Sequence, residues 1–202
     1  MTLAQLYRKN SRKKGYLVKV LVRSPDKLGD LKEEVIVING DLIDSLAVEQ
    51  ALQGSVAVIN AAGGAKEPDQ FSKFQQIGKI LTEQMRKFGI KSLINMSGAV
   101  MNLPSEKLDL KRIIMKIFVL IIFKQIKLAQ DAILPIIIND KELSWTFVRA
   151  AMISKKRGIG KVLASDKRMP GTTIMLEDLA KFIVEQITTK DWIIKAPFVA
   201  SK

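Results

Sequence analysis

The sequence predicts an α/β protein in which a parallel sheet is flanked by helices. Short runs rich in β-branched residues alternate with longer segments of helical periodicity, which is typical of βαβ units. Some of the short runs, such as residues 56–59, are apolar throughout, as expected of parallel strands buried on both faces. The length of 202 residues fits a single domain, residues 1–202, with a sizeable core.

Six strands are expected, each a short run that ends at glycine, proline or a polar residue. They lie at residues 16–22, 35–38, 56–60, 91–96, 144–149 and 197–200. We expect them to be parallel.

The helices are predicted from apolar residues that recur every three or four positions. The clearest covers residues 71–88 and ends at Gly89. An earlier helix begins with Asp44 or Ser45 as its N-cap and stops at Gly54. Further helices are expected at residues 3–14, about 110–134 and about 176–187, with residues 135–139 continuing irregularly after the second of these.

The composition excludes several classes of site. Hydrophobic residues make up 48% and charged residues 26%, as in soluble globular proteins. The absence of Cys and His excludes disulfides, Cys/His zinc sites and Ser-His or Cys-His catalysis. We expect a cytoplasmic protein, since no signal peptide precedes the first periodic segment. We expect no transmembrane segment either, because the most apolar run, residues 113–123, is well short of the roughly 20 residues of a spanning helix.

The formal net charge of +13 is concentrated partly in residues 8–14 and 155–161. Such charge can attract nucleic acid or an anionic membrane. No nucleic-acid-binding motif accompanies it, so we expect no nucleic-acid partner and interpret these cations as solvated. The basic apolar segment at residues 110–127 leaves three roles open: a membrane surface, the chain's own core, or a second subunit in a homo-oligomer.

Ligands of parallel α/β sheets bind outside the carboxyl ends of the strands. The strand-end residues, in order, resemble the atypical short-chain dehydrogenase/reductases, which bind NAD(P) with a Rossmann fold. NmrA-like and biliverdin reductase B-like proteins are the most similar groups. The resemblance runs from about Leu3 to the C-terminus, and its carriers are residues 20–28, 39–42, 58–63, 96–98, 145–149, 169–171 and 177–180.

The resemblance implies a cofactor site. Arg23 takes the place of the basic residue that meets the 2′-phosphate, which implies NADP rather than NAD. Asp41 and Leu42 match the pair at the adenine. The remaining positions, in turns where backbone approaches the cofactor, are Ala61, Ala62, Gly63 and Ala150. The alternatives are a solvated strand-end Arg23 and an Asp41 that only accepts turn backbone hydrogen bonds.

The resemblance also implies catalytic residues. Ser97 matches the serine that hydrogen-bonds a substrate carbonyl. The usual Tyr and Lys, four residues apart, correspond to Phe123 and Lys127. Phe has no acidic proton, so proton transfer falls to Ser97, Lys127, water or the substrate. Alternatively, Lys127 is one more cation on a basic helix.

The family begins with a strand and a glycine-rich turn that binds pyrophosphate at a helix N-terminus. No glycine precedes Gly15, and residues 3–14 resemble the helix that follows that turn. We therefore expect an N-terminally incomplete sheet, and NADP(H) binding that is weak or lost. The two neighbours of the absent strand would lack their shared partner unless the sheet closes differently.

Two functions follow from the resemblance. One is an NADPH-dependent oxidoreductase that acts on a small carbonyl or conjugated substrate. The other is a catalytically inactive nucleotide-binding or redox-sensing regulator, which the absent loop and Phe123 favour.

Overall fold

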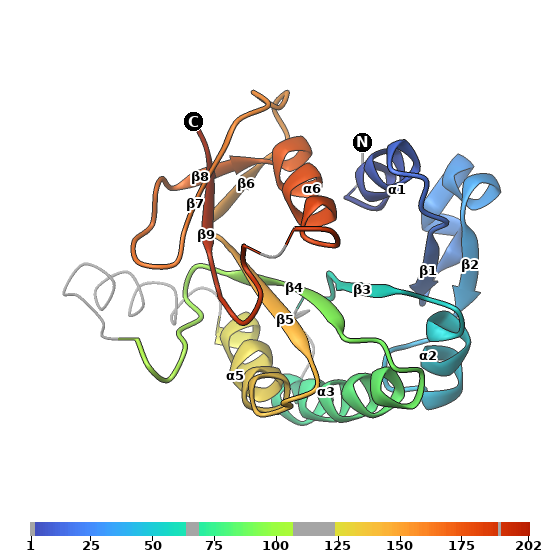
Figure 1. Cartoon of the computed structure of the whole chain (residues 1–202). Helices are drawn as coiled ribbons and strands as arrows, with labels where there is room; N and C mark the ends of the chain where they lie inside the picture. The colour runs from blue at the N-terminus through green and yellow to red at the C-terminus, as the bar shows by residue number, and fades with distance from the viewer. Residues whose placement is uncertain (1–2, 64–68, 107–123, 190) are drawn as a thin grey trace.

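The computed structural model describes residues 3–63, 69–106, 124–189 and 191–202. Strands and helices alternate through these ranges and confirm the α/β class (Figure 1). The elements are α1 (Leu3–Lys13), β1 (Lys19–Val22), η1 (Pro25–Glu34), β2 (Ile36–Asn39), α2 (Ser45–Leu52), β3 (Ala57–Asn60), α3 (Gln70–Lys87), β4 (Ser92–Gly98), α5 (Lys124–Ile138), β5 (Ser144–Ala150), β6 (Met152–Ser154), β7 (Val162–Ser165), β8 (Thr173–Met175), α6 (Leu176–Glu185) and β9 (Phe198–Ser201).

The main sheet has five strands in the order β3-β4-β5-β9-β7. The first four are parallel, as predicted, whereas β7 runs antiparallel to β9. Helices α3 and α5 cover one face of the sheet, and α1 and α6 cover the other (Figure 1). Each face is buried by its own apolar cluster, and both β4 and β5 contribute buried apolar side chains to each of the two clusters.

Strands β1 and β2 form a separate parallel pair. No strand lies between β1 and β3 in the part of the chain that the structure describes. The sheet therefore remains interrupted where the family's first strand would stand, rather than closing up. Two apolar side chains that precede β1 and β3 are largely exposed: Leu17 is 77% and Val56 is 72% exposed.

Most of the described element boundaries agree with the sequence prediction to within two residues, and the differences are larger at β1 and α5. β1 begins at Lys19 rather than at residue 16. α5 continues through Pro135 to Ile138, although proline removes a helical hydrogen bond. The buried Ile133, Leu134 and Ile137 of α5 belong to the cluster shared with α3, and this packing holds the last turn in place. Residues 110–123 of the predicted basic helix lie outside the described residues.

Four short elements were not predicted: η1, β6, β7 and β8. The three strands have only three or four residues each, too few to show a period. η1 contains a kink at Gly29, where φ is 55°, so it lacks the regular spacing of a longer helix. Asp44, by contrast, caps α2 as predicted, because its carboxylate accepts from the backbone N–H groups of Leu46 and Ala47.

Candidate functional site

A cavity of about 360 Å³ lies at the carboxyl ends of β1, β2 and β3. Five of the residues expected at the cofactor line it together: Arg23, Asp41, Leu42, Ala62 and Gly63. Ala61 does not line it and packs instead towards the cluster around α1 and α6. The remaining lining residues are Leu21, Val22, Ser24, Lys27, Leu28, Gly40, Gln70, Lys73, Phe74 and Ile77.

The cavity carries an excess of positive charge. Lys73 Nζ lies 3.3 Å from Asp41 Oδ2, and Arg23 Nη1 lies 3.9 Å from the same oxygen. Among the described lining residues, Lys27 is a third cation and Asp41 is the only carboxylate. A concave site with this balance attracts an anionic group such as a phosphate.

Lys27 and Lys73 were not among the cofactor-binding residues predicted from the sequence. Lys73 stands in the first turn of α3, the helix that follows β3 and its loop. In a parallel α/β sheet that position lies at the ligand edge, which is the signal that could have identified it. Lys27 lies four residues after Arg23 in η1, an element that was not predicted.

Two buried asparagines hold the turn after β3. Asn60 Nδ2 donates to Asn95 Oδ1 at 2.7 Å, across neighbouring positions of β3 and β4. Asn60 Oδ1 then accepts from the backbone N–H of Ala62 at 3.1 Å. The side chain of Asn60 thus fixes the start of the small-residue turn that lines the cavity.

Gly40 permits the close approach of α2 to the end of β2. A Cβ atom at this position would lie 2.4 Å from the Cβ of Ala47, a helical atom that cannot rotate away. We expect Gly40→Ala to lower the free energy of unfolding by ~1–3 kcal/mol, the usual range for overpacking. Urea denaturation measures this. Gly63→Ala is the control, since a Cβ there meets nothing within 4 Å, and an equal effect of both changes would contradict the packing argument.

Ser97 lies at the end of β4 and Ala150 at the end of β5, the two strands that follow β3 in the order of the sheet. Ser97 pairs in register with Arg149, and Gly98 with Ala150. The buried Ser97 hydroxyl donates to the sulfur of Met101 at 3.2 Å. The carbonyl of Ala150 accepts from the backbone N–H of Ala99 at 3.0 Å. Neither residue is among those that line the cavity.

Arg149 anchors the loop that follows β4. Its guanidinium is fully buried and makes two contacts of 2.8 Å with the carboxylate of Glu106. It also donates to the carbonyl of Met101 at 3.2 Å and lies 3.6 Å from the ring centre of Phe198. Residues 101–106 are thereby tied to β5 and β9, beside Ser97. Arg149 belongs to a segment that resembles the family, residues 145–149, but its anchoring role was not predicted from the sequence.

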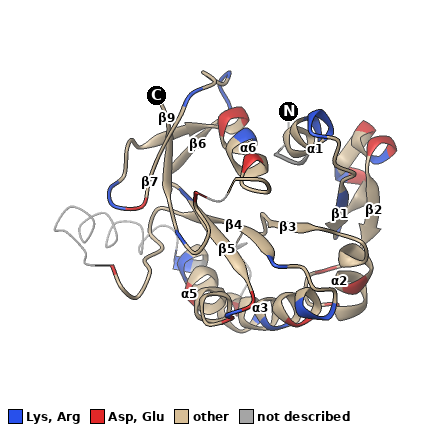
Figure 2. Ribbon diagram, viewed as in Figure 1, with Lys and Arg blue, Asp and Glu red and all other residues tan. Residues whose placement is uncertain are grey.

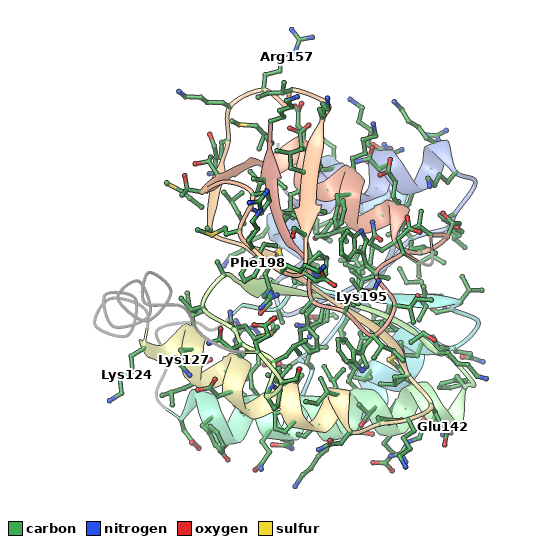
Figure 3. The ribbon with its side chains drawn as sticks, turned by 60° about the vertical axis from the view of Figure 1, so that its left-hand side comes forward. Lys124, Lys127, Glu142, Arg157, Lys195 and Phe198 are labelled. Carbon is green, nitrogen blue, oxygen red and sulfur yellow. The ribbon has the colours of Figure 1, made fainter. Side chains whose placement is uncertain are left out.

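Lys127 lies on α5, where Figure 3 labels it, and its ammonium pairs with Asp131 one turn later. The same helix reaches the end of β4 through Gln130, whose side-chain nitrogen would be 3.0 Å from a Cβ at Gly98. Lys127 is thus on the helix beside Ser97, but its charge is directed to Asp131. Phe123 lies outside the described residues.

The described residues hold no group of three or more acidic side chains that could bind a metal ion. Within the same ranges, no helix combines the length and the apolar character needed to cross a membrane.

The chain matches the model of a known protein family. The model of the NAD(P)H-binding family matches residues 3–190, nearly the whole chain. The chain belongs to this NAD(P)H-binding family. No curated protein sequence matches the chain significantly. The resemblance to atypical short-chain dehydrogenase/reductases is confirmed at this level.

Solved structures with the same fold include proteins of related description. The oxidoreductase ylbE from Lactococcus lactis has a TM-score of 0.77 at 15% identity, covering 99% of this chain and 86% of its own. A short-chain dehydrogenase/reductase from Veillonella parvula has a TM-score of 0.72 at 13% identity, covering 98% and 88%. A Rossmann-fold NAD(P)-binding protein from Shigella flexneri has a TM-score of 0.67 at 18% identity, covering 98% and 87%. At these identities the likeness establishes the Rossmann-like fold.

Proposed function

We propose that this NAD(P)H-binding protein prefers NADP(H) and is an NADPH-dependent reductase of the atypical, NmrA-like type acting on a small carbonyl or conjugated substrate. The observation that carries the cofactor preference is the cluster of Arg23, Lys27 and Lys73 at the ends of β1 and β2. Arg23 can bind a phosphate through two hydrogen bonds, and Lys73 adds a second positive charge beside it.

The remaining residues have roles that follow from their positions. Leu42 offers an apolar surface and Asp41 an acceptor for the adenine, while Ala62 and Gly63 line the approach. The bound nicotinamide would supply the hydride. Ser97 would orient a substrate carbonyl by its hydroxyl, and Lys127 would take part in proton transfer, as the family resemblance implies.

Binding of NADP(H) is proposed to be weak in this chain. The described residues place no glycine-rich turn between β1 and β3, where a pyrophosphate would meet backbone N–H groups. The adenine and 2′-phosphate half of the cofactor keeps its binding residues, whereas the pyrophosphate loses its main donors.

The first test compares NADPH and NADH by calorimetric titration at millimolar ligand. We expect NADPH to bind more tightly by ~1–3 kcal/mol, the scale of hydrogen bonds to a charged group, and Arg23→Ala to remove most of this difference. Arg86→Ala is the matched control, because the Arg86 side chain is 51% exposed against 56% for Arg23 and pairs with Asp140 instead. Equal affinities, or a preference that survives Arg23→Ala, would count against this role of Arg23.

A second candidate function is a nucleotide-binding regulator without catalysis. The pairing of Lys127 with Asp131, rather than with Ser97, favours it. The two candidates are separated by following NADPH absorbance with a panel of small aldehydes, ketones and quinones at saturating cofactor. Turnover with any of them supports the reductase, whereas binding without oxidation supports the regulator.

A further inference from the structure

The connection between β6 and β7, residues 155–161, is a basic loop on the outside of the molecule. Its four cations are exposed, and they are Lys155, Lys156, Arg157 and Lys161. Figure 2 shows this positive charge next to α6, and in Figure 3 the side chain of Arg157 extends away from the body of the protein. Among the described residues, none of the four forms an ion pair. Their charge is therefore directed to solvent.

Two carboxylates at the start of α6 bind the backbone of this loop. Glu177 accepts from the N–H of Gly158 at 3.0 Å. Asp178, which is only 3% exposed, accepts from the N–H groups of Ile159 and Gly160 at 3.0 and 2.9 Å. A Cβ atom at Gly158 would lie 2.7 Å from Asp178 Oδ1, so the contact needs a glycine there. These carboxylates hold the shape of the loop instead of compensating its cations.

Exposed aliphatic side chains accompany the cations. Ile159 lies in the middle of the loop between two glycines and is 58% exposed, and Met152, three residues before Lys155, is 59% exposed. An anionic lipid surface matches this combination, because its headgroups attract the cations and its acyl boundary accepts an aliphatic side chain. Nucleic acid would also attract the cations, but its bases stack on aromatic side chains, and residues 152–161 contain none.

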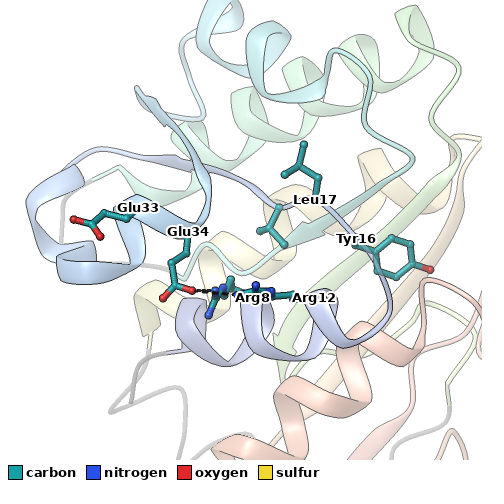
Figure 4. A pocket seen from close by; sticks show the side chains of 7 residues that line it. Arg8, Arg12, Tyr16, Leu17, Glu33 and Glu34 are labelled. Carbon is teal, nitrogen blue, oxygen red and sulfur yellow. Dashed lines mark ion pairs between the residues drawn. The ribbon is translucent and has the colours of Figure 1, made fainter.

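The other basic segment, residues 8–14, is partly compensated within the protein. Arg8 and Arg12 both approach the carboxylate of Glu34, Arg12 at 4.0 Å, on the wall of a hollow of about 330 Å³ (Figure 4). The two segments carry similar charge but differ in what that charge meets. Residues 8–14 therefore provide a control for the effect of net charge alone.

We propose that residues 155–161 form a docking loop for an anionic membrane surface, with the cations against the headgroups and Ile159 inserted beside them. No residue of the loop lines either of the two cavities described above, so an extended surface suits it better than one small anion. A single aliphatic side chain with four cations gives reversible binding that weakens as salt screens the charges. The inference does not depend on cofactor binding, because the loop shares no residue with the cofactor cavity.

The test measures sedimentation of the protein with lipid vesicles in the absence of nucleotide. One set of vesicles is phosphatidylcholine alone, and the other contains about one third phosphatidylglycerol. At about 0.1 M salt we expect the anionic vesicles to be bound at least about tenfold more tightly, and about 0.5 M salt to remove most of this difference. Equal binding to both vesicles, or binding to neither, would overturn the proposal.

Variants of the cations locate the binding. Glutamine at three positions of the docking loop should weaken affinity for the anionic vesicles by at least about tenfold, since each cation near such a surface contributes roughly fivefold. These changes are Lys155→Gln, Lys156→Gln and Arg157→Gln. The control removes the same charge from the other segment by Arg12→Gln, Lys13→Gln and Lys14→Gln and should have a smaller effect. Equal weakening by the two triple variants would assign the binding to net charge and overturn the proposal.

A variant of Ile159 separates a lipid surface from other anionic partners. Ile159→Ser should weaken vesicle binding at least about threefold and leave its salt dependence unchanged, because it removes the inserted side chain and no charge. Ile194→Ser is the control, since Ile194 is 61% exposed and lies outside the loop. Equal effects of the two changes would overturn the proposal. Binding of a single-stranded oligonucleotide as tightly as the anionic vesicles, unaffected by Ile159→Ser, would also overturn it and assign the loop to nucleic acid.

Discussion

A variant with an apolar strand and a glycine-rich turn fused ahead of Leu3 is expected to bind NADPH at least about a hundredfold more tightly than the 202-residue chain. The added strand would take the place between β1 and β3 where the sheet is interrupted, and α1 would then follow the turn directly, so that its first N–H groups meet the pyrophosphate. Each regained hydrogen bond to a charged group contributes ~1.5–3 kcal/mol, and two of them suffice for this gain.

Calorimetric titration of both proteins with NADPH measures this effect. The control is the same fusion with the glycines of the turn replaced by valines, which restores the strand but blocks the close approach of backbone to phosphate. Submicromolar binding by the unfused chain would contradict the expectation, because the remaining contacts would then suffice alone. A gain of equal size in the valine control would assign the effect to stability of the sheet.

The second large effect is expected at the buried ion pair. Arg149→Met should lower the free energy of unfolding by ~3–5 kcal/mol, because it leaves the carboxylate of Glu106 without its partner in a largely buried position. Urea denaturation measures the loss. Replacing both residues, as Arg149→Met with Glu106→Gln, should recover part of it, since no uncompensated charge remains.

Arg86→Met provides the comparison for this pair. Arg86 also pairs with an aspartate, Asp140 at 3.6 Å, but its side chain is about half exposed. Exposed pairs contribute ~0–1 kcal/mol, so this change should have a small effect. Losses of similar size for Arg149→Met and Arg86→Met would show that the loop after β4 is not held by Arg149.

Most of the fold could be predicted because the sequence shows it locally. The apolar period of residues 71–88 defines α3, and the capping carboxylate of Asp44 sets the start of α2. What could not be predicted depends on tertiary contact. Pro135 lies inside α5 because packing on α3 outweighs the lost hydrogen bond, and β6 and β8 are recognisable only by their pairing with each other.

The residues of the candidate site also fall into those that local sequence signals predicted and those that only tertiary contacts reveal. Arg23 and Asp41 were predicted because each lies at the carboxyl end of a strand, where parallel sheets bind ligands, and because each matches the family pattern. Lys73 was missed because it reaches the cavity from a helix far along the chain. The anchor between Arg149 and Glu106 was missed because it joins residues 43 positions apart through a loop of no regular structure. The assignment of Ser97 and Lys127 to catalysis stays a prediction.

In the proposed function, the carboxyl ends of β1 and β2 bind the adenosine 2′-phosphate end of NADP(H). The most direct measurement is an NMR titration of the chain with 2′,5′-ADP, which carries that end of the cofactor and lacks the pyrophosphate and nicotinamide. We predict saturable changes in the amide signals of Arg23, Asp41 and Lys73, with 5′-AMP binding more weakly. Changes confined to other basic segments, such as residues 155–161, or equal affinity for both nucleotides, would contradict the account.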